Sequence, residues 1–264
     1  MRYLREAVCV TAAATMTLAV AVPAFAAEAA PNYVALGDSY SSGVGSRDYF
    51  EDSGDCLRSP KSYAQLWADS HGASLTFNAC SGATTDDVNS NQLTGLSGDT
   101  TLVTISVGGN DVGFSGVVQD CLLGSDGSCD DAVSAAEEKG RTELPGKLDT
   151  TYANIKQAAP NAEVVVLGYP RLNQPTGSCG IPGFSEAKRQ RINAGADALA
   201  EIISDRASAA GFKFADPRDV FDGHGVCSGS EWINGPSNPL QESFHPNVSG
   251  YAEGYLPTLN AVTG

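Results

Sequence analysis

The sequence has few basic residues and few histidines. It contains 16 lysines and arginines against 31 aspartates and glutamates, with only three histidines, and its formal net charge is −15 at pH 7. Proteins that bind nucleic acid carry a basic patch, so this charge balance argues against a nucleic-acid partner. An excess of acidic charge keeps a protein soluble, and we expect that role for it outside the cell.

Long hydrophobic runs are missing except near the N-terminus. Two arginines precede an apolar segment over residues 8–22, and Ala24 and Ala26 have the small-x-small spacing of a cleavage site. This pattern predicts a secretory signal peptide over residues 1–26. The apolar segment is shorter than the roughly 20 residues of a spanning helix, so we expect no stable membrane insertion. We expect a secreted, extracellular monomer with one domain over residues 27–264.

The cysteines lack the spacing of metal ligands. No two of them form a Cys-x-x-Cys pair, which argues against zinc, and we expect no metal. Cys9 would leave with the signal peptide, and the six cysteines that remain predict three disulfides in an exported chain. Many pairings are open to six cysteines. The short Gly-, Ser- and Asp-rich segment between Cys121 and Cys129 is the easiest to close, which favours pairing in sequence order.

Strand-like and helix-like segments alternate along the chain. The segments with the composition of buried strands are 33–36, 74–79, 101–107, 163–167 and 212–215. Helices are predicted at 62–68, from Thr85, at 130–158 with a break at Pro145, at 185–210, and at 248–262 with a break at Pro257. This alternation predicts an α/β protein with three layers, in which helices cover both faces of a mainly parallel central sheet (α/β/α).

Three loops at strand ends carry residues suited to acyl transfer. Gly37-Asp38-Ser39 follows the first predicted strand, Gly82 lies after the second, and Asn110 lies after the third. Ligands bind beyond the carboxyl ends of parallel strands, so these loops are expected to be neighbours. Ser39 is the candidate nucleophile, and its own N–H, the Gly82 N–H and the Asn110 amide are the candidate oxyanion donors.

A serine nucleophile needs a base, and the chain offers three histidines. His71 precedes a glycine at a predicted helix end, where a cation favours the local dipole, so we assign it a structural role. His224 lies in a Gly-His-Gly loop close to Cys227, and we interpret it as a loop residue. His245 lies just before the last predicted helix, which can bring it over the sheet edge, and it is the candidate base.

Four of these features occur together in one order: Gly37-Asp38-Ser39, Gly82, Gly108-Gly109-Asn110-Asp111 and His245. In these blocks, and over nearly the whole chain after the signal peptide, the sequence resembles the SGNH hydrolases, also called GDSL lipases and esterases. The resemblance implies their flavodoxin-like fold. The chain also has no Gly-x-Ser-x-Gly pentapeptide, which argues against the nucleophile elbow of the α/β-hydrolases.

Within that family the sequence is most similar to secreted bacterial esterases, lipases and phospholipases that have six cysteines. This resemblance implies three disulfides, which are Cys56–Cys80, Cys121–Cys129 and Cys179–Cys227. The last block of the family is usually Asp-x-x-His, but Glu242 stands in the place of the aspartate here. Either the Glu242 carboxylate or a main-chain carbonyl of Glu242 or Ser243 would then orient His245, and we favour the carbonyl.

We therefore expect a secreted serine ester hydrolase that needs no cofactor. Ser39 would attack a carboxylic ester with His245 as base, and the resemblance implies that the ester is that of a lipid. Its activity would be that of a lipase, an esterase or a phospholipase. The alternatives are a carbohydrate O-deacetylase and a non-catalytic extracellular binding module. The four intact blocks argue against a binding module, which has no use for all of them.

Overall fold

The computed structural model describes residues 3, 7 and 30–263 of the chain. The signal peptide predicted over residues 1–26 lies outside the described part except for two isolated residues, and it stays a prediction. Among the described helices, none combines the length and the apolar character that crossing a bilayer requires.

A parallel sheet of five strands forms the centre of the molecule. The strands are β1 (Asn32–Gly37), β2 (Ser74–Phe77), β3 (Leu102–Ser106), β4 (Glu163–Leu167) and β5 (Lys213–Ala215). Their order in the sheet is β2-β1-β3-β4-β5, and every pair is parallel. The chain order reverses between β1 and β3, and a ligand crevice lies beside such a switch point. The predicted α/β class is confirmed.

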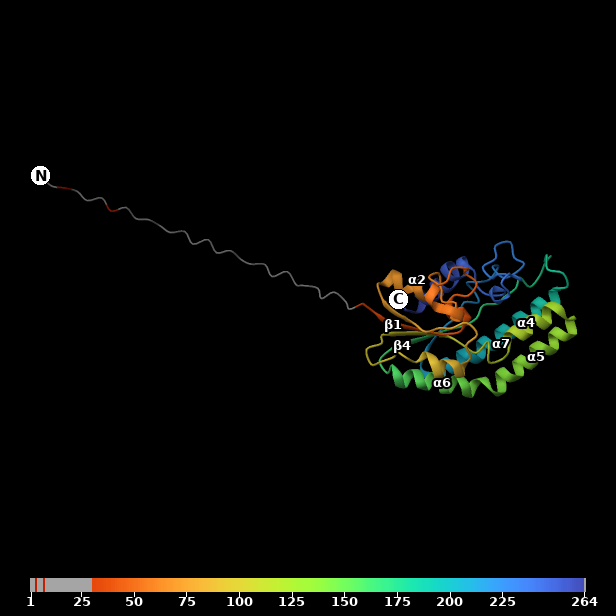
Figure 1. Ribbon diagram of the computed structural model, residues 1–264, viewed down its shortest axis with the longest axis horizontal. Coiled ribbons are helices and arrows are strands. Elements are labelled where there is room, and N and C mark those ends of the chain that lie inside the picture. Colours follow the sequence, from red (N-terminus) through yellow and green to blue (C-terminus); the bar gives the residue numbers. More distant parts are fainter. Residues whose placement is uncertain (1–2, 4–6, 8–29, 264) are drawn as a thin grey trace.

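Apolar side chains on both faces explain why the central strands form. All five residues of β3 are buried, and so are four of the five in β4. Strands covered by helices on both sides have such continuous apolar runs, because neither face of the sheet meets water. In Figure 1 helices α4 to α7 lie on one side of the sheet, and α2 and the C-terminal segment lie on the other.

The helices begin and end close to their expected positions. They are α1 (Ser39–Ser42), α2 (Tyr63–His71), α3 (Thr85–Asp87), α4 (Phe114–Leu123), α5 (Asp126–Thr142), α6 (Leu144–Ala158), α7 (Glu186–Ala210) and α8 (Leu256–Thr263). A 3₁₀ helix spans Glu51–Cys56, and π-helical turns span Val88–Gln92 and Gly250–Tyr255. Helix α4 has no counterpart in the sequence-based prediction. Pro145 lies in the first turn of α6, where a missing N–H costs nothing. The break expected at Pro257 is absent, because the π-helical turn Gly250–Tyr255 runs directly into α8.

Three disulfides link loops and helices on the sides of the sheet. They are Cys56–Cys80, Cys121–Cys129 and Cys179–Cys227, the same pairs that the resemblance implies. The first joins the 3₁₀ helix to the loop after β2, and the second joins α4 to α5. The third joins the loop after β4 to the long loop after β5.

Candidate active site

Ser39 lies where β1 gives way to a short helix. Gly37 has φ +119°, and a Cβ there would collide with the main chain of Ser106 on β3, so only glycine allows the close approach. Asp38 caps α1, because its Oδ1 accepts from the Tyr40 N–H at 3.0 Å. This turn places Ser39 at the first position of α1, at the carboxyl edge of the sheet.

His245 contacts Ser39 directly. The distance from His245 Nε2 to Ser39 Oγ is 2.7 Å, and His245 Nδ1 lies 2.9 Å from the Ser243 carbonyl oxygen. A carbonyl only accepts hydrogen bonds, so Nδ1 carries the proton and Nε2 is left as an acceptor for the serine hydroxyl. The structure thus brings together the two residues that the sequence pairs as nucleophile and base.

Burial sets the charge state of the imidazole. It lowers the pKa of His245 to about 4, and the hydrogen bond from Nδ1 to the Ser243 carbonyl raises the pKa only in part. His245 is therefore neutral at pH 7 and able to accept a proton.

The Glu242 carboxylate faces other partners. Glu242 is buried, its Oε2 accepts from Arg47 Nε at 2.9 Å, and its Oε1 accepts from the Tyr49 hydroxyl at 2.8 Å. No hydrogen bond joins Glu242 to His245 in the described part of the chain. Of the two groups considered from the sequence, the main-chain carbonyl of Ser243 is the one in contact with the imidazole.

The three candidate oxyanion donors lie on neighbouring loops, because the Cys80 N–H donates to the Gly37 carbonyl at 3.0 Å and Asn110 lies on the loop that contacts Ala83. Neither the Ser39 N–H nor the Gly82 N–H donates to another described main-chain or side-chain group. Asn110 Nδ2 donates to the Ala83 carbonyl at 2.9 Å, which holds the two loops together and uses one of its two N–H groups. Free donors beside the serine can stabilise negative charge that develops on a substrate oxygen.

A buried tyrosine connects these loops, and sequence reasoning missed it. Tyr169 follows β4, and its hydroxyl donates to Asp38 Oδ2 at 2.5 Å while it accepts from the Gly109 N–H at 3.2 Å. Asp38 precedes Ser39 and Gly109 precedes Asn110, so one hydroxyl fixes both loops. Burial raises the pKa of Asp38 to about 7, and the Tyr169 hydrogen bond opposes that rise. The only sequence signal for this role is that Tyr169 follows Gly168 at the end of a predicted strand.

The carboxylate of Asp111, next to Asn110, holds two loops together. Its oxygens accept from the Thr85 N–H at 3.0 Å and from the Thr85 hydroxyl at 2.6 Å.

The other two histidines contact tryptophans. His71 stacks on Trp67 with ring centres 4.0 Å apart, and His224 stacks on Trp232 at 3.6 Å. Both contacts are structural ones.

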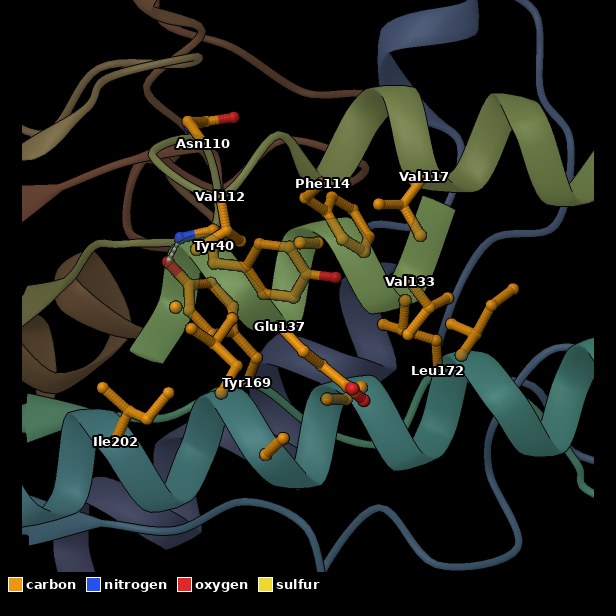
Figure 2. Close-up of a pocket in the computed structure, with 18 of the residues that line it drawn as sticks. Tyr40, Asn110, Val112, Phe114, Val117, Val133, Glu137, Tyr169, Leu172 and Ile202 are labelled. Carbon is orange, nitrogen blue, oxygen red and sulfur yellow. Dashed lines mark hydrogen bonds between the residues drawn. The ribbon is translucent and has the colours of Figure 1, made fainter. Parts of the chain in front are cut away.

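An apolar pocket extends from Ser39 under the helices. It begins at Ser39, Tyr40 and Asn110 and continues between α4, α5 and α7. Its apolar lining is Val112, Phe114, Val117, Val133, Leu172, Ile192, Leu199 and Ile202. Figure 2 shows Phe114 and Val117 projecting from α4 on one side and Ile202 from α7 on the other. The carboxylate of Glu137 in the lining is neutralised by Arg191, whose Nη1 lies 2.6 Å from Oε1. Such a pocket suits an unbranched hydrocarbon chain.

Comparisons with known proteins identify the family of the chain. The model of the GDSL-like lipase/acylhydrolase family matches residues 35–253. The chain is 48% identical over 251 residues to a Streptomyces coelicolor protein named Lipase 1, and the match covers 94% of this chain and 93% of that relative.

Two crystal structures are similar over most of their length. An extracellular lipase from Streptomyces rimosus has a TM-score of 0.86 and 46% identity, and the match covers 89% of this chain and all of that one (100%). A phospholipase A1 from Streptomyces albidoflavus has a TM-score of 0.86 and 45% identity, covering 88% of this chain and 99% of its own. The chain therefore belongs to the GDSL-like lipase/acylhydrolase family.

Proposed function

We propose that this serine ester hydrolase cleaves acyl esters of lipids, with Ser39 as nucleophile and His245 as general base. The observation that carries the proposal is the 2.7 Å contact between Ser39 Oγ and His245 Nε2 at the mouth of an apolar pocket. The contact supports nucleophilic attack, and the pocket supports a hydrophobic acyl group.

The reaction uses groups already in place. Ser39 Oγ attacks the ester carbonyl carbon while its proton passes to His245 Nε2. The Ser39 and Gly82 N–H groups and the Asn110 amide donate to the carbonyl oxygen as it becomes negative. His245 returns the proton to the leaving alcohol, and an acyl group remains on Ser39. Water then attacks the acyl-enzyme with His245 again as base, and the acid leaves.

Main-chain support takes the place of an acidic third member. The Ser243 carbonyl accepts from His245 Nδ1 at 2.9 Å, so it fixes the tautomer and the ring orientation. It also stabilises the imidazolium that forms during attack, because the carbonyl dipole points its negative end at the charged ring. The site is a Ser39–His245 dyad held by a carbonyl. These groups supply nucleophile, base and electrostatic stabilisation, and the proposed reaction involves no metal or organic cofactor.

The lipid substrate, the secretion and the monomeric state belong to the same proposal. The relatives named lipase and phospholipase A1 support a lipid ester. The extracellular Streptomyces rimosus lipase and the three disulfides support secretion, since disulfides persist in oxidising compartments. A carbohydrate O-deacetylase is the second candidate, but an acetyl group would leave most of the apolar pocket empty.

Labelling with a fluorophosphonate tests the nucleophile. We expect the wild-type protein to take up one equivalent of probe on the peptide that contains Ser39, and Ser39→Ala to take up none. Ser70→Ala, which changes an exposed serine on α2, is the matched control and should be labelled like wild type. A wild-type protein that is not labelled, or a Ser39→Ala variant labelled equally well, would overturn the enzyme mechanism.

A series of p-nitrophenyl esters tests the acyl group. A lipid acyl hydrolase predicts that kcat/KM rises from acetyl to medium-chain or longer acyl groups, because each buried CH₂ contributes about 0.8 kcal/mol. A maximum at acetyl, with hydrolysis of acetylated polysaccharide, would favour the deacetylase instead.

A further inference from the structure

A second hollow lies on the other side of the oxyanion donors, and its lining is polar. Gly82 and Ala83 form part of its wall, together with the Cys56–Cys80 disulfide and the π-helical turn Val88–Gln92. The apolar pocket begins at Asn110, whose amide donates to the Ala83 carbonyl at 2.9 Å. The two hollows therefore adjoin at the residues that would bind the oxyanion.

The back wall of this polar hollow is fixed. Asn78 Nδ2 donates to the carbonyls of Gln92 and Thr94, at 2.7 and 2.6 Å. The Gln92 side chain accepts from the Gly37 N–H at 2.7 Å and donates to the Gly37 carbonyl at 2.9 Å. These two amides are engaged in holding the fold and are not free to bind a ligand. The remaining polar lining consists of Ser81, Asn91 and the two charged residues Arg58 and Asp87.

Arg58 supplies the positive charge of the polar hollow. Its guanidinium makes no hydrogen bond or ion pair with any described residue, and it is the only described arginine of which this is true. The others bind carboxylates or, in the case of Arg189, main-chain carbonyls. Arg58 is half-buried in the wall of the hollow. A guanidinium without a partner presents a planar fork of donors that matches phosphate oxygens.

Asp87 supplies a separate negative charge. Its Oδ2 accepts from the Thr84 N–H at 2.9 Å and from the Thr84 hydroxyl at 2.6 Å. These two hydrogen bonds lower the pKa of Asp87, so the carboxylate stays ionised at neutral pH. Arg58 and Asp87 line the same hollow without forming an ion pair with each other, so each charge is available to a ligand.

We propose that this polar hollow binds the zwitterionic headgroup of a glycerophospholipid, with the phosphate at Arg58 and the ammonium group toward Asp87. The inference rests on the proposed ester hydrolysis at Ser39. The acyl chain would occupy the apolar pocket, the ester would sit at the oxyanion donors, and the phosphate-bearing alcohol would lie in the polar hollow. Arg58 is then a specificity-determining residue that favours phospholipids over neutral acylglycerols, whose alcohol carries no anion.

Matched substrates in detergent micelles test the role of Arg58. The three substrates are phosphatidylcholine, phosphatidylglycerol and diacylglycerol with identical acyl chains. We expect Arg58→Gln to lower the ratio of kcat/KM for phosphatidylcholine to that for diacylglycerol by about tenfold, since a charge-assisted hydrogen bond to phosphate is lost. Lys61→Gln removes a nearby exposed cation outside the hollow and should leave the ratio unchanged.

Asp87→Asn tests the second half of the proposal. The amide oxygen of asparagine can still accept from Thr84, so the cap is retained while the charge is removed. We expect the ratio of phosphatidylcholine to phosphatidylglycerol hydrolysis to fall, because only the first substrate carries an ammonium group.

The outcomes separate this inference from the proposed function. Equal losses on all three lipids in Arg58→Gln, or an unchanged ratio, would overturn the headgroup site while ester hydrolysis stands. A wild-type protein that cleaves none of the lipids and no p-nitrophenyl ester would overturn the proposed function itself.

Discussion

Ser39 lies at the carboxyl edge of the sheet, whereas His245 lies on a long loop. Different kinds of contact hold the two residues in position. On the sheet edge, the Asp38 N–H donates to the Ser106 carbonyl on β3 at 2.9 Å, and Asp38 caps α1 with its side chain. The position of Ser39 thus follows from strand register and from one cap. Side-chain hydrogen bonds to Asp38 and Gly109 complete the support through Tyr169.

The loop over residues 216–249 has no regular strand and holds His245 by main-chain contacts. The Asn234 N–H donates to the His245 carbonyl at 2.9 Å, and the Phe244 N–H donates to the Asn234 carbonyl at 2.8 Å. The Tyr40 hydroxyl donates to the Phe244 carbonyl at 2.6 Å and so ties this loop to α1. Main-chain groups orient His245, so side-chain substitutions in the long loop should lower activity less than substitutions around Ser39 at the sheet edge.

The largest effect on the sheet-edge side is expected from the oxyanion donors. Asn110→Ala should lower kcat by about 100- to 1,000-fold, because one donor to the developing oxyanion is lost. Steady-state kinetics on a p-nitrophenyl ester measures it. Asn161→Ala is the control, since its amide also donates to a main-chain carbonyl, that of Gly98, at 2.9 Å. A loss below about threefold in Asn110→Ala would remove this residue from the oxyanion site.

The pH dependence of kcat/KM tests the environment of His245 on the long loop. Burial lowers the pKa of His245 to about 4, and only the neutral imidazole accepts the Ser39 proton. Activity should therefore be present above that pKa and be lost as the pH falls through about 4. At pH 5 we expect kcat/KM at about nine-tenths of its plateau, against about 3% for a histidine with a pKa near 6.5. A midpoint near 6.5 would mean that water reaches the imidazole.

A smaller effect is expected from the tyrosine between the two sheet-edge loops. Tyr169→Phe keeps the ring but removes the hydroxyl that joins Asp38 to Gly109. We expect kcat to fall up to about tenfold with little change in KM, since a hydrogen bond contributes up to about 1.5 kcal/mol. Tyr152→Phe is the control, because that buried hydroxyl has no hydrogen-bond partner among the described residues. Equal kinetics in the two variants would show that the bridge does not position the loops.

The residues at the carboxyl edge of the sheet could be predicted from the sequence, because their positions follow from local sequence patterns. A glycine at a strand end, a capping aspartate and alternating strands and helices fix where Ser39, Gly82 and Asn110 must lie. The bounds of β4 and α7 were predicted to within a residue for the same reason, since their apolar patterns are long and regular.

Contacts between distant segments could not be predicted. The pairing of Glu242 with Arg47 and Tyr49 joins positions almost 200 residues apart, and no pattern in the sequence marks it. Helix α4 was missed because the glycines around it, at positions 113 and 116, favour a loop when the packing against α5 is unknown. Tyr169 was missed because a buried hydroxyl shows its role only through its partners.

The most direct test of the Ser39–His245 dyad is kcat/KM for Glu242→Gln. Glutamine keeps an acceptor for Tyr49 or Arg47, and neither Glu242 oxygen contacts the imidazole. If the Ser243 carbonyl orients His245, the variant should keep kcat/KM within about threefold of wild type, with an unchanged pH midpoint. A loss of about a thousandfold would mean that the carboxylate acts as the third member of a triad, and it would contradict the account.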